Sequence, residues 1–149
     1  MNQIEKALSD FPDGKIIGTE INKNGDSIAV LLVSSKSSFD IYLYDSHVAI
    51  NAHPRLFCEV KYHPEINDST YFILEDIIAV NEGVGNGSIL LKYLIREARK
   101  AGASYIKGSL SYFDKDEFYK LIPFYKKHGF KVTMNEDGQS GRIRLDLSL

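Results

Sequence analysis

The chain has 149 residues, 44% of them hydrophobic, and a formal net charge of −2. This length suits one domain spanning 1–149, and the composition supports a buried core, which excludes a disordered chain. The small net charge gives no electrostatic reason to expect a nucleic-acid or membrane surface. Cys58 is the only cysteine, which excludes a disulfide framework and a cysteine metal cluster. No apolar run has the length of a membrane span or a signal-peptide core, so we expect a cytoplasmic protein.

The first half of the chain predicts a short helix followed by several strands. Residues 2–8 are expected to form the helix, which ends before Pro12. Strands are predicted over 15–22, 27–34, 39–44 and 55–63. Asn24-Gly25, between the first two strands, is the strongest short-range signal for a hairpin. Residues 48–50 are ambiguous, and 64–69 predict a polar turn.

The stretch 73–101 predicts the end of a strand, a turn with three glycines and an amphipathic helix. The strand spans 70–80, and its apolar end suits a central strand covered on both faces. After the glycines, apolar residues recur at helical spacing: Leu90, Leu91, Leu94, Ile95 and Ala98. Gly102 suits the end of this helix, and 104–112 predicts another strand. A strand, a helix and a strand in this order imply a right-handed crossover between two parallel strands, with the glycines at the carboxyl end of the first.

The last part of the chain predicts a helix and a hairpin. Residues 114–128 have a helical pattern that contains Pro123. Because proline disrupts a helix interior but is favoured at a first helical position, we expect a kink or a helix restarting near Pro123. Residues 130–134 and 142–147 predict a hairpin around Asp137-Gly138. Its buried face comprises Ile143, Leu145 and Leu147.

The segment Gly83-Val84-Gly85-Asn86-Gly87-Ser88 is a candidate anion site. At a helix N-terminus the backbone N–H groups are free and the helix dipole is positive, and glycine allows a phosphate to approach closely. The segment lacks the Lys-Ser/Thr pair of a Walker loop, and its G-x-G-x-G spacing is not the G-x-G-x-x-G of a dinucleotide site. The alternative is a tight turn that needs glycine only for its backbone dihedral angles.

Two motifs follow one another in the second half of the chain. Gly85-x-Gly87-Ser88-x-Leu90-Leu91 comes after Val80, and Phe124-Tyr125-x-x-x-Gly129-Phe130 comes after one further strand. From about residue 72 onward, the chain therefore resembles the GNAT superfamily of acetyl-CoA-dependent N-acetyltransferases. The resemblance implies an α+β fold, with a mixed, mostly antiparallel sheet whose parallel central strands splay apart and with flanking helices. It also implies that acetyl-CoA (coenzyme A) enters this splay.

The resemblance implies roles for individual residues. The backbone of three strand residues would pair with the pantetheine arm: Ile78, Ala79 and Val80. The glycine loop would hold the pyrophosphate through Gly83, Gly85, Asn86, Gly87 and Ser88. Tyr125 matches the tyrosine that, in many members, protonates the departing thiolate. The spacing of Tyr125 on a helical face also fits an ordinary core aromatic.

Acetyl transfer to an amine needs a neutral amine, a polarised carbonyl and a stabilised thiolate. Glu75 and Asp76 are the candidate bases, and Glu75 is favoured because family members often place a glutamate on this strand. Adjacent strand residues point to opposite faces, so only one of the two is expected to face the substrate. The alternative is that both are solvated or paired strand carboxylates with no catalytic role. No histidine pair has metal-ligand spacing, and His128 lies near a helix end, where a cation is favoured.

Two hypotheses for function remain open. The first is an enzyme that moves an acetyl group from acetyl-CoA to a primary amine of a small molecule or peptide by direct attack in a ternary complex. The second is a catalytically degenerate acyl-CoA-binding or protein-interaction module. It is motivated by Glu82, which stands where the family usually has Gln or Arg, and by a segment between Val80 and Gly85 that is shorter than the usual one. In the same loop, Val84 stands where the family commonly has a basic or amide residue. Tyr112 and Phe113 are candidate walls of the acceptor site, and assembly into a homodimer is left open.

Overall fold

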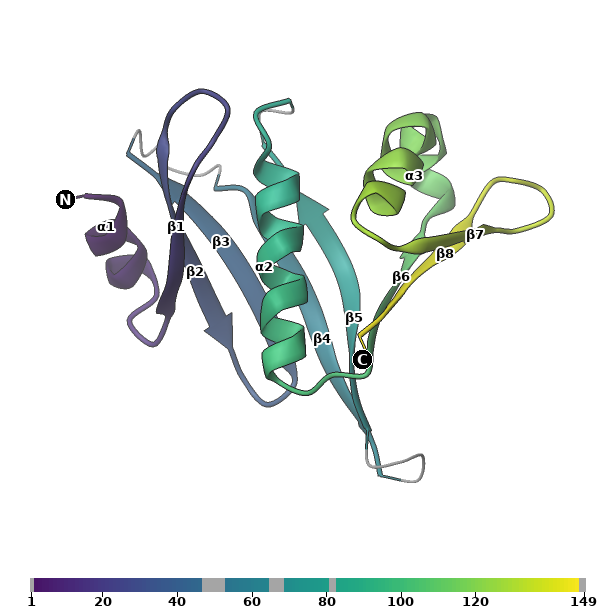
Figure 1. Ribbon diagram of the computed structural model, residues 1–149, viewed down its shortest axis with the longest axis horizontal. Helices are drawn as coiled ribbons and strands as arrows, with labels where there is room; N and C mark the ends of the chain where they lie inside the picture. Colours follow the sequence, from purple (N-terminus) through teal and green to yellow (C-terminus); the bar gives the residue numbers. More distant parts are fainter. Residues whose placement is uncertain (1, 47–52, 65–68, 81–82, 148–149) are drawn as a thin grey trace.

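The computed structural model describes residues 2–46, 53–64, 69–80 and 83–147. Within these residues the chain forms one eight-stranded sheet with three α-helices and one 3₁₀ helix (Figure 1). The elements are α1 (Gln3–Asp10), β1 (Lys15–Ile21), β2 (Ser27–Ser34), β3 (Ser38–Asp45), β4 (Arg55–His63), β5 (Ser69–Ile78), α2 (Asn86–Lys100), β6 (Tyr105–Leu110), η1 (Tyr112–Glu117), α3 (Phe118–Lys127), β7 (Lys131–Met134) and β8 (Gly141–Asp146).

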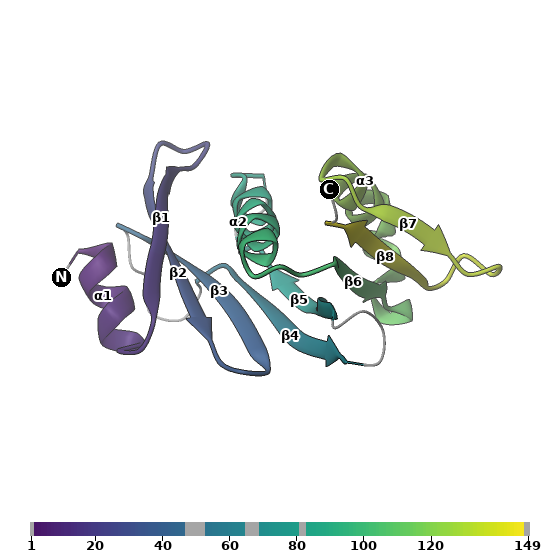
Figure 2. The ribbon, with the colours of Figure 1, turned by 60° about the horizontal axis from the view of Figure 1, so that its bottom comes forward.

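The strands lie in the order β1-β2-β3-β4-β5-β6-β8-β7. β5 and β6 are parallel, and the other neighbouring pairs are antiparallel. The parallel pairing is short, because it ends where Leu74 lies opposite Gly108, while β5 continues to Ile78 and β6 to Leu110. The two strands therefore separate toward their carboxyl ends, and the sheet opens there (Figures 1 and 2). The predicted splayed parallel pair is confirmed.

The sheet is covered on both faces, and β2 shows why. Ile28 and Val30 belong to the large core cluster, which also contains the apolar side chains of α2 and α3. Ala29 and Leu31, which alternate with them, pack with Ala7 of α1 in a second cluster. Because successive strand residues point to opposite faces, α1 covers one face and α2 the other. This arrangement explains why β2 is an unbroken apolar run.

α2 follows its sequence pattern closely. Leu90, Leu91, Leu94 and Ala98 are fully buried, and Gly102 ends the helix in the left-handed region with φ +75°. Glu97 is also buried, at 8% exposure, and it pairs with Arg96 and Lys100. The buried face of α2 therefore fixes the position of the helix N-terminus, where the glycine loop ends.

Two predicted elements differ from the structure. β5 ends at Ile78, two residues before the predicted end of the strand. The expected restart of the helix near Pro123 is also wrong, because α3 runs continuously from Phe118 to Lys127 and the change of helix type occurs before Phe118. Proline removes only the N–H that would reach the Tyr119 carbonyl, and Tyr119 is 75% exposed, so water can replace that bond. The ambiguous residues 48–50 and most of the predicted turn 64–69 lie outside the described residues.

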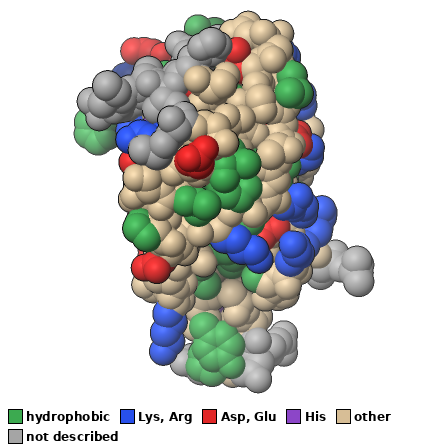
Figure 3. Space-filling model, turned by 90° about the vertical axis from the view of Figure 1, so that its left-hand side faces the viewer, with side chains coloured by type: hydrophobic (Ala, Val, Ile, Leu, Met, Phe, Trp, Pro, Cys, Tyr) green, Lys and Arg blue, Asp and Glu red, His purple; other side chains and the backbone are tan. Residues whose placement is uncertain are grey.

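The surface at the α1 end of the sheet has no large apolar face in the view of Figure 3. Hydrophobic side chains there form small separate groups among backbone and charged side chains. None of the described helices combines the length and the hydropathy that a membrane crossing requires.

Candidate functional site

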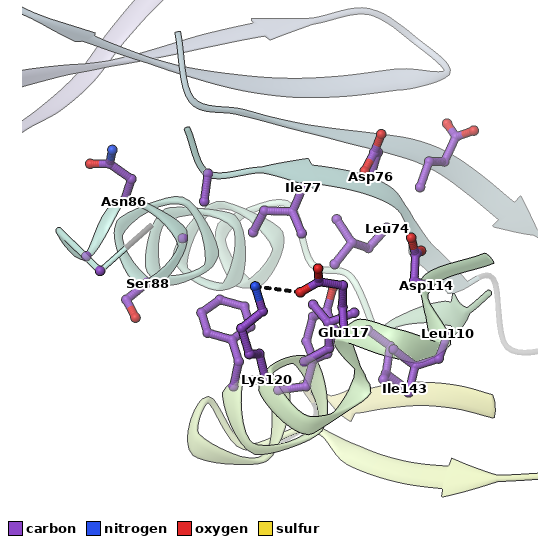
Figure 4. Close-up of a pocket in the computed structure, with 18 of the residues that line it drawn as sticks. Leu74, Asp76, Ile77, Asn86, Ser88, Leu110, Asp114, Glu117, Lys120 and Ile143 are labelled. Carbon is purple, nitrogen blue, oxygen red and sulfur yellow. Dashed lines mark ion pairs between the residues drawn. The ribbon is translucent and has the colours of Figure 1, made fainter. Parts of the chain in front are cut away.

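The separation of β5 from β6 opens a cleft of about 490 Å³. Its apolar lining comes from both sides of the splay: Leu74, Ile77, Leu110, Phe124, Tyr125 and Ile143. Figure 4 shows Asn86 and Ser88 at one end of the cleft, and Asp76 and Asp114 toward the other. The cleft therefore has one end formed by backbone amides and one end formed by carboxylates.

The glycine loop forms the first end of the cleft. Gly83 and Gly85 have φ of +90° and +91°, a conformation that side chains rarely adopt. Gly85 is the N-cap of α2, and its carbonyl accepts the first bond of the helix, from the Ile89 N–H at 3.1 Å. The N–H groups of 86–88 precede that bond, and no side chain caps α2. They form an anion cradle in the positive end of the helix dipole.

Gly87 is required by packing as well. A Cβ built on Gly87 would lie 3.2 Å from Cζ of Phe124 and 3.5 Å from Cβ of Ala79. The start of α2, the end of the β5 segment and α3 therefore meet at this glycine. Asn86 strengthens the junction, because its Nδ2 donates to the Val80 carbonyl at 3.1 Å. The buried Asn86 Oδ1 has no hydrogen-bond partner among the described residues.

In the predicted pantetheine segment, only alternate residues line the cleft. Ala79 lines it, together with Ile77, whereas Ile78 and Val80 are not among the lining residues. Since β6 pairs with β5 only as far as Leu74, the β6-facing edge of β5 beyond that residue has backbone groups open to the cleft. Of the two predicted acceptor walls, Phe113 is 92% exposed and Tyr112 is 49% exposed, and neither lines the cleft.

Tyr125 lies in the wall of the cleft and is only 6% exposed. Its ring packs edge-on against Phe124 and Phe130, with centroids 5.4 and 5.6 Å away. Its hydroxyl forms no hydrogen bond with a described residue. Burial, followed by the charges of Asp76 and Asp114, raises the pKa of Tyr125 to about 12. The phenol is therefore protonated at neutral pH and its proton is not committed to another group.

A β-bulge changes the placement of the two candidate bases. In the pairing of β4 with β5, Phe57 lies opposite Asp76 and Cys58 lies opposite Leu74, so Glu75 is the extra residue. Leu74 and Ile77 both contact the large core, so strict alternation is broken between them. Glu75 and Asp76 are both exposed and both line the cleft. The expectation that one of them would face away is therefore wrong.

The two carboxylates have different surroundings. Burial is the main cause of the raised pKa of Tyr125, of Asp40 and of Cys58. The charge of Asp76 adds to the shift of Tyr125, whereas the charge of Glu75 adds to the shifts of Asp40 and Cys58. Asp76 is therefore the one whose charge acts on the tyrosine. Across the cleft, Asp114 and Glu117 also line the wall, and Glu117 is paired with Lys120 (Figure 4).

Two residues at the cradle were not predicted from the sequence. Ser88 Oγ lies 2.9 Å from Nε2 of His128, at the end of α3. Burial, and then the charge of Lys127, lowers the pKa of His128. Lys23, in the β1–β2 hairpin, also lines the cleft. The spacing of neither residue signals these contacts, because both depend on tertiary packing.

Two further sequence features are the possible metal ligands and the unusual loop residues Glu82 and Val84. Among the described residues, no three His, Cys, Asp or Glu side chains are grouped to hold a metal ion. The unusual loop residue Glu82 lies outside the described residues. Val84 is within them, and its carbonyl accepts a hydrogen bond from the Lys23 N–H at 3.1 Å.

Solved structures of acetyltransferases share the fold of this chain. The GNAT domain of S. lividans PAT matches 87% of this chain and 96% of its own, with a TM-score of 0.60 at 11% identity. The chain has the GNAT fold. Arabidopsis thaliana NAA60, in complex with acetyl-CoA, matches 76% of this chain and 78% of its own, with a TM-score of 0.57 at 8% identity. Arabidopsis thaliana Naa50, in complex with the bisubstrate analogue CoA-Ac-MVNAL, matches 72% of each chain, with a TM-score of 0.54 at 18% identity.

The sequence comparisons identify a relative but no activity. Over 132 residues, which are 89% of this chain and 76% of the relative, the chain is 29% identical to YocC, an uncharacterized protein of Bacillus subtilis strain 168. No family model matches. The predicted GNAT fold is thus confirmed from structural similarity, and the chemistry of this GNAT cleft has to be inferred from its own residues.

Proposed function

We propose that the protein is an acetyl-CoA-dependent N-acetyltransferase and that residues 1–149 form one acyltransferase domain. The cleft carries this proposal, because it combines an uncapped helix N-terminus with a buried tyrosine whose hydroxyl is not hydrogen-bonded to a described residue. Its acceptor is a primary amine of a small molecule or peptide. The acetyl-CoA bound to the NAA60 structure, which has the same fold, supports this choice of cofactor.

The cleft has suitable hydrogen-bonding groups for two parts of acetyl-CoA, the diphosphate and the pantetheine arm. A diphosphate suits the amides of 86–88, because no side chain caps them and Gly87 allows a close approach. An extended pantetheine arm suits the edge of β5 beyond Leu74, because strand-like pairing can continue there after β6 has diverged. The cofactor would supply the thioester whose acetyl group is transferred.

The chain's own residues would provide proton transfer. We propose Glu75 as the base that takes a proton from the amine, directly or through water, with Asp76 as the second candidate because its charge acts on Tyr125. The neutral amine nitrogen would then attack the thioester carbonyl carbon, the C–S bond would break, and the nitrogen would lose its second proton to water to give the amide. Tyr125 donates its phenolic proton to the leaving thiolate, and its phenolate is returned to the neutral state by a proton from solvent. General acid catalysis of this kind typically contributes about 10²–10⁴-fold.

The proposal is tested by thiol release from acetyl-CoA in the presence of a panel of primary amines. Amine-dependent release, accompanied by the mass of an acetylated amine, is expected. A thermal-shift series with acetyl-CoA, CoA and ATP is the companion measurement, because a ligand at about 100 times its Kd stabilises the folded state by about 2.7 kcal/mol. Stabilisation by ATP alone, or by none of the three, contradicts the proposal.

A catalytically degenerate acyl-CoA-binding or protein-interaction module is the second candidate. It is favoured by the glycine loop, in which Val84 takes the place of a basic or amide residue. Stabilisation by CoA species without acetylation of any amine, in a screen that includes peptide N-termini, lysine side chains and small amines, would support an acyl-CoA-binding module over the enzyme.

A further inference from the structure

The β1–β2 hairpin brings a lysine to the glycine loop. We propose that Lys23, at the tip of this hairpin, binds the diphosphate of acetyl-CoA and supplies the positive side chain that the loop lacks. The inference rests on the proposed acetyl-CoA binding. It assigns a cofactor contact to the first half of the chain, far in sequence from the glycine motif.

The hairpin is held along α2 by polar contacts. Glu20 of β1 accepts hydrogen bonds from Lys92 Nζ at 2.8 Å and from the Tyr93 hydroxyl at 2.9 Å. Further along the helix, Arg96 donates to the Ile17 carbonyl at 2.6 Å. These three contacts tie one face of α2 to β1 over successive turns. They fix where the hairpin tip lies relative to the start of the helix.

Close packing reinforces this alignment. The Tyr93 ring lies so near the backbone of Gly18 that a Cβ there would overlap its hydroxyl. β1 also shifts register against β2 between Ile16 and Gly18. A glycine and a bulge at the same place let β1 approach the helix. In Figures 1 and 2, the tip of the hairpin and the N-terminus of α2 lie at the same end of the molecule.

At the tip, Lys23 joins the glycine loop directly. Its N–H donates to the Val84 carbonyl at 3.1 Å. Its side chain crosses the left-handed glycine that begins the cradle, because a Cβ built on Gly85 would lie 3.8 Å from both Cγ and Cε of Lys23. The aliphatic part of the Lys23 side chain therefore passes Gly85, which immediately precedes the N–H groups of 86–88. No ion pair joins Lys23 to a described residue.

The other cations near the cleft are less well placed. Of the lysines and arginines in the described residues, Lys23 and Lys120 line the cleft, and Lys120 is paired with Glu117. Lys126 and Lys127, in the last turn of α3, do not line it. His128 is near the cradle, but burial lowers its pKa. Lys23 is therefore the described cation that is suited to a diphosphate bound at 86–88.

The test measures the Kd of acetyl-CoA by calorimetry for the wild type and for Lys23→Met. Because Lys23 is exposed, we expect Lys23→Met to bind about 1.5–5-fold more weakly at low salt, as for one exposed charge contact. The difference should shrink at about 1 M salt, where the Debye length is about 3 Å. Lys36→Met is the matched control, since Lys36 is an exposed lysine in the β2–β3 turn and does not line the cleft.

Two truncated ligands locate the contact. S-Acetylpantetheine, which has no diphosphate, should bind wild type and Lys23→Met equally. Acetyl-dephospho-CoA, which keeps the diphosphate and lacks the 3′-phosphate, should show the same loss on substitution as acetyl-CoA. Loss of the effect with acetyl-dephospho-CoA would move the contact to the 3′-phosphate and overturn the assignment.

Other results separate the inference from the proposed function. Equal Kd values for wild type and Lys23→Met at low salt overturn the role of Lys23 and leave acetyl-CoA binding intact. A wild-type protein that binds no CoA species overturns the proposed function itself. An equal loss of S-acetylpantetheine binding, or a lower thermal midpoint of the free Lys23→Met protein, would show that the side chain acts through the fold, and that also overturns the inference.

Discussion

Tyr125→Phe removes one oxygen atom and should separate catalysis from folding. The Tyr125 hydroxyl has no hydrogen-bond partner among the described residues, and the ring alone makes the packing contacts with Phe124 and Phe130. The free energy of unfolding should therefore change by less than about 0.5 kcal/mol, because no internal hydrogen bond is lost. The Kd of acetyl-CoA should also remain close to the wild-type value.

Turnover should fall strongly in the same variant. If Tyr125 protonates the leaving thiolate, its removal should lower kcat by about 10²–10⁴-fold. At about 1.36 kcal/mol per factor of ten, this is about 2.7–5.4 kcal/mol of transition-state stabilisation. Since the pKa of Tyr125 is raised to about 12, its proton should remain available throughout the neutral range. Wild-type activity should not decline from loss of this proton below about pH 10.

The assay is steady-state release of thiol from acetyl-CoA with a saturating amine, combined with urea unfolding of each variant. Tyr119→Phe is the matched control, because Tyr119 lies on the same helix, is 75% exposed and does not line the cleft. A Tyr125→Phe enzyme with wild-type kcat refutes the role of the tyrosine as the acid. An unfolding free energy lowered by several kcal/mol refutes the claim that the hydroxyl is structurally uncommitted.

Three further predictions concern the loop, the buried thiol and the half-buried His128. Gly85→Ala should lower the free energy of unfolding by about 1–2 kcal/mol in urea titrations, because residue 85 has φ +91°; an unchanged midpoint contradicts this. Cys58 is buried with a raised pKa, so a thiol reagent should label it only as fast as the protein unfolds, and rapid native labelling would be the opposite result. Burial lowers the pKa of His128 below 6.5 in the folded protein. As the pH falls, the imidazole is therefore protonated first in the unfolded chain, and the free energy of unfolding falls below about pH 6.5. His128→Gln should reduce that loss between about pH 7.5 and 5.5, and an identical pH slope in both proteins would be inconsistent with a lowered pKa of His128.

The elements that were predicted well are those set by local periodicity. β4 matches its predicted range of 55–63, and α2 buries the predicted apolar stripe and ends near Gly102. The Asn24-Gly25 turn joins β1 and β2 as an antiparallel pair. In each case the signal lies within a few residues, where backbone preference and side-chain alternation act together.

The features that were missed depend on contacts between distant segments. The bulge at Glu75 is defined by the register of β5 against β4, and no residue type at 75 or 76 announces it. The environment of His128 shows the same limit. A helix end favours a cation, but packing of the imidazole beside Phe124 and Ser88 desolvates it, and desolvation lowers the pKa. The helix-dipole rule does not include burial, which depends on the tertiary packing around the imidazole.

The charge balance of the cradle indicates why the N-terminal hairpin matters to the proposed site. A helix N-terminus contributes about half an elementary charge, which is less than the charge of a diphosphate. In a loop where Val84 replaces a basic or amide residue, the rest has to come from solvent or from another segment. The hairpin meets this need because Val84 still provides a carbonyl, which binds the Lys23 N–H and leaves the lysine side chain beside Gly85. The loop sequence alone contains no cation to bind a diphosphate. In the folded chain, Lys23 of the β1–β2 hairpin supplies one, and the hydrogen bonds of Glu20 to α2 fix the position of that hairpin.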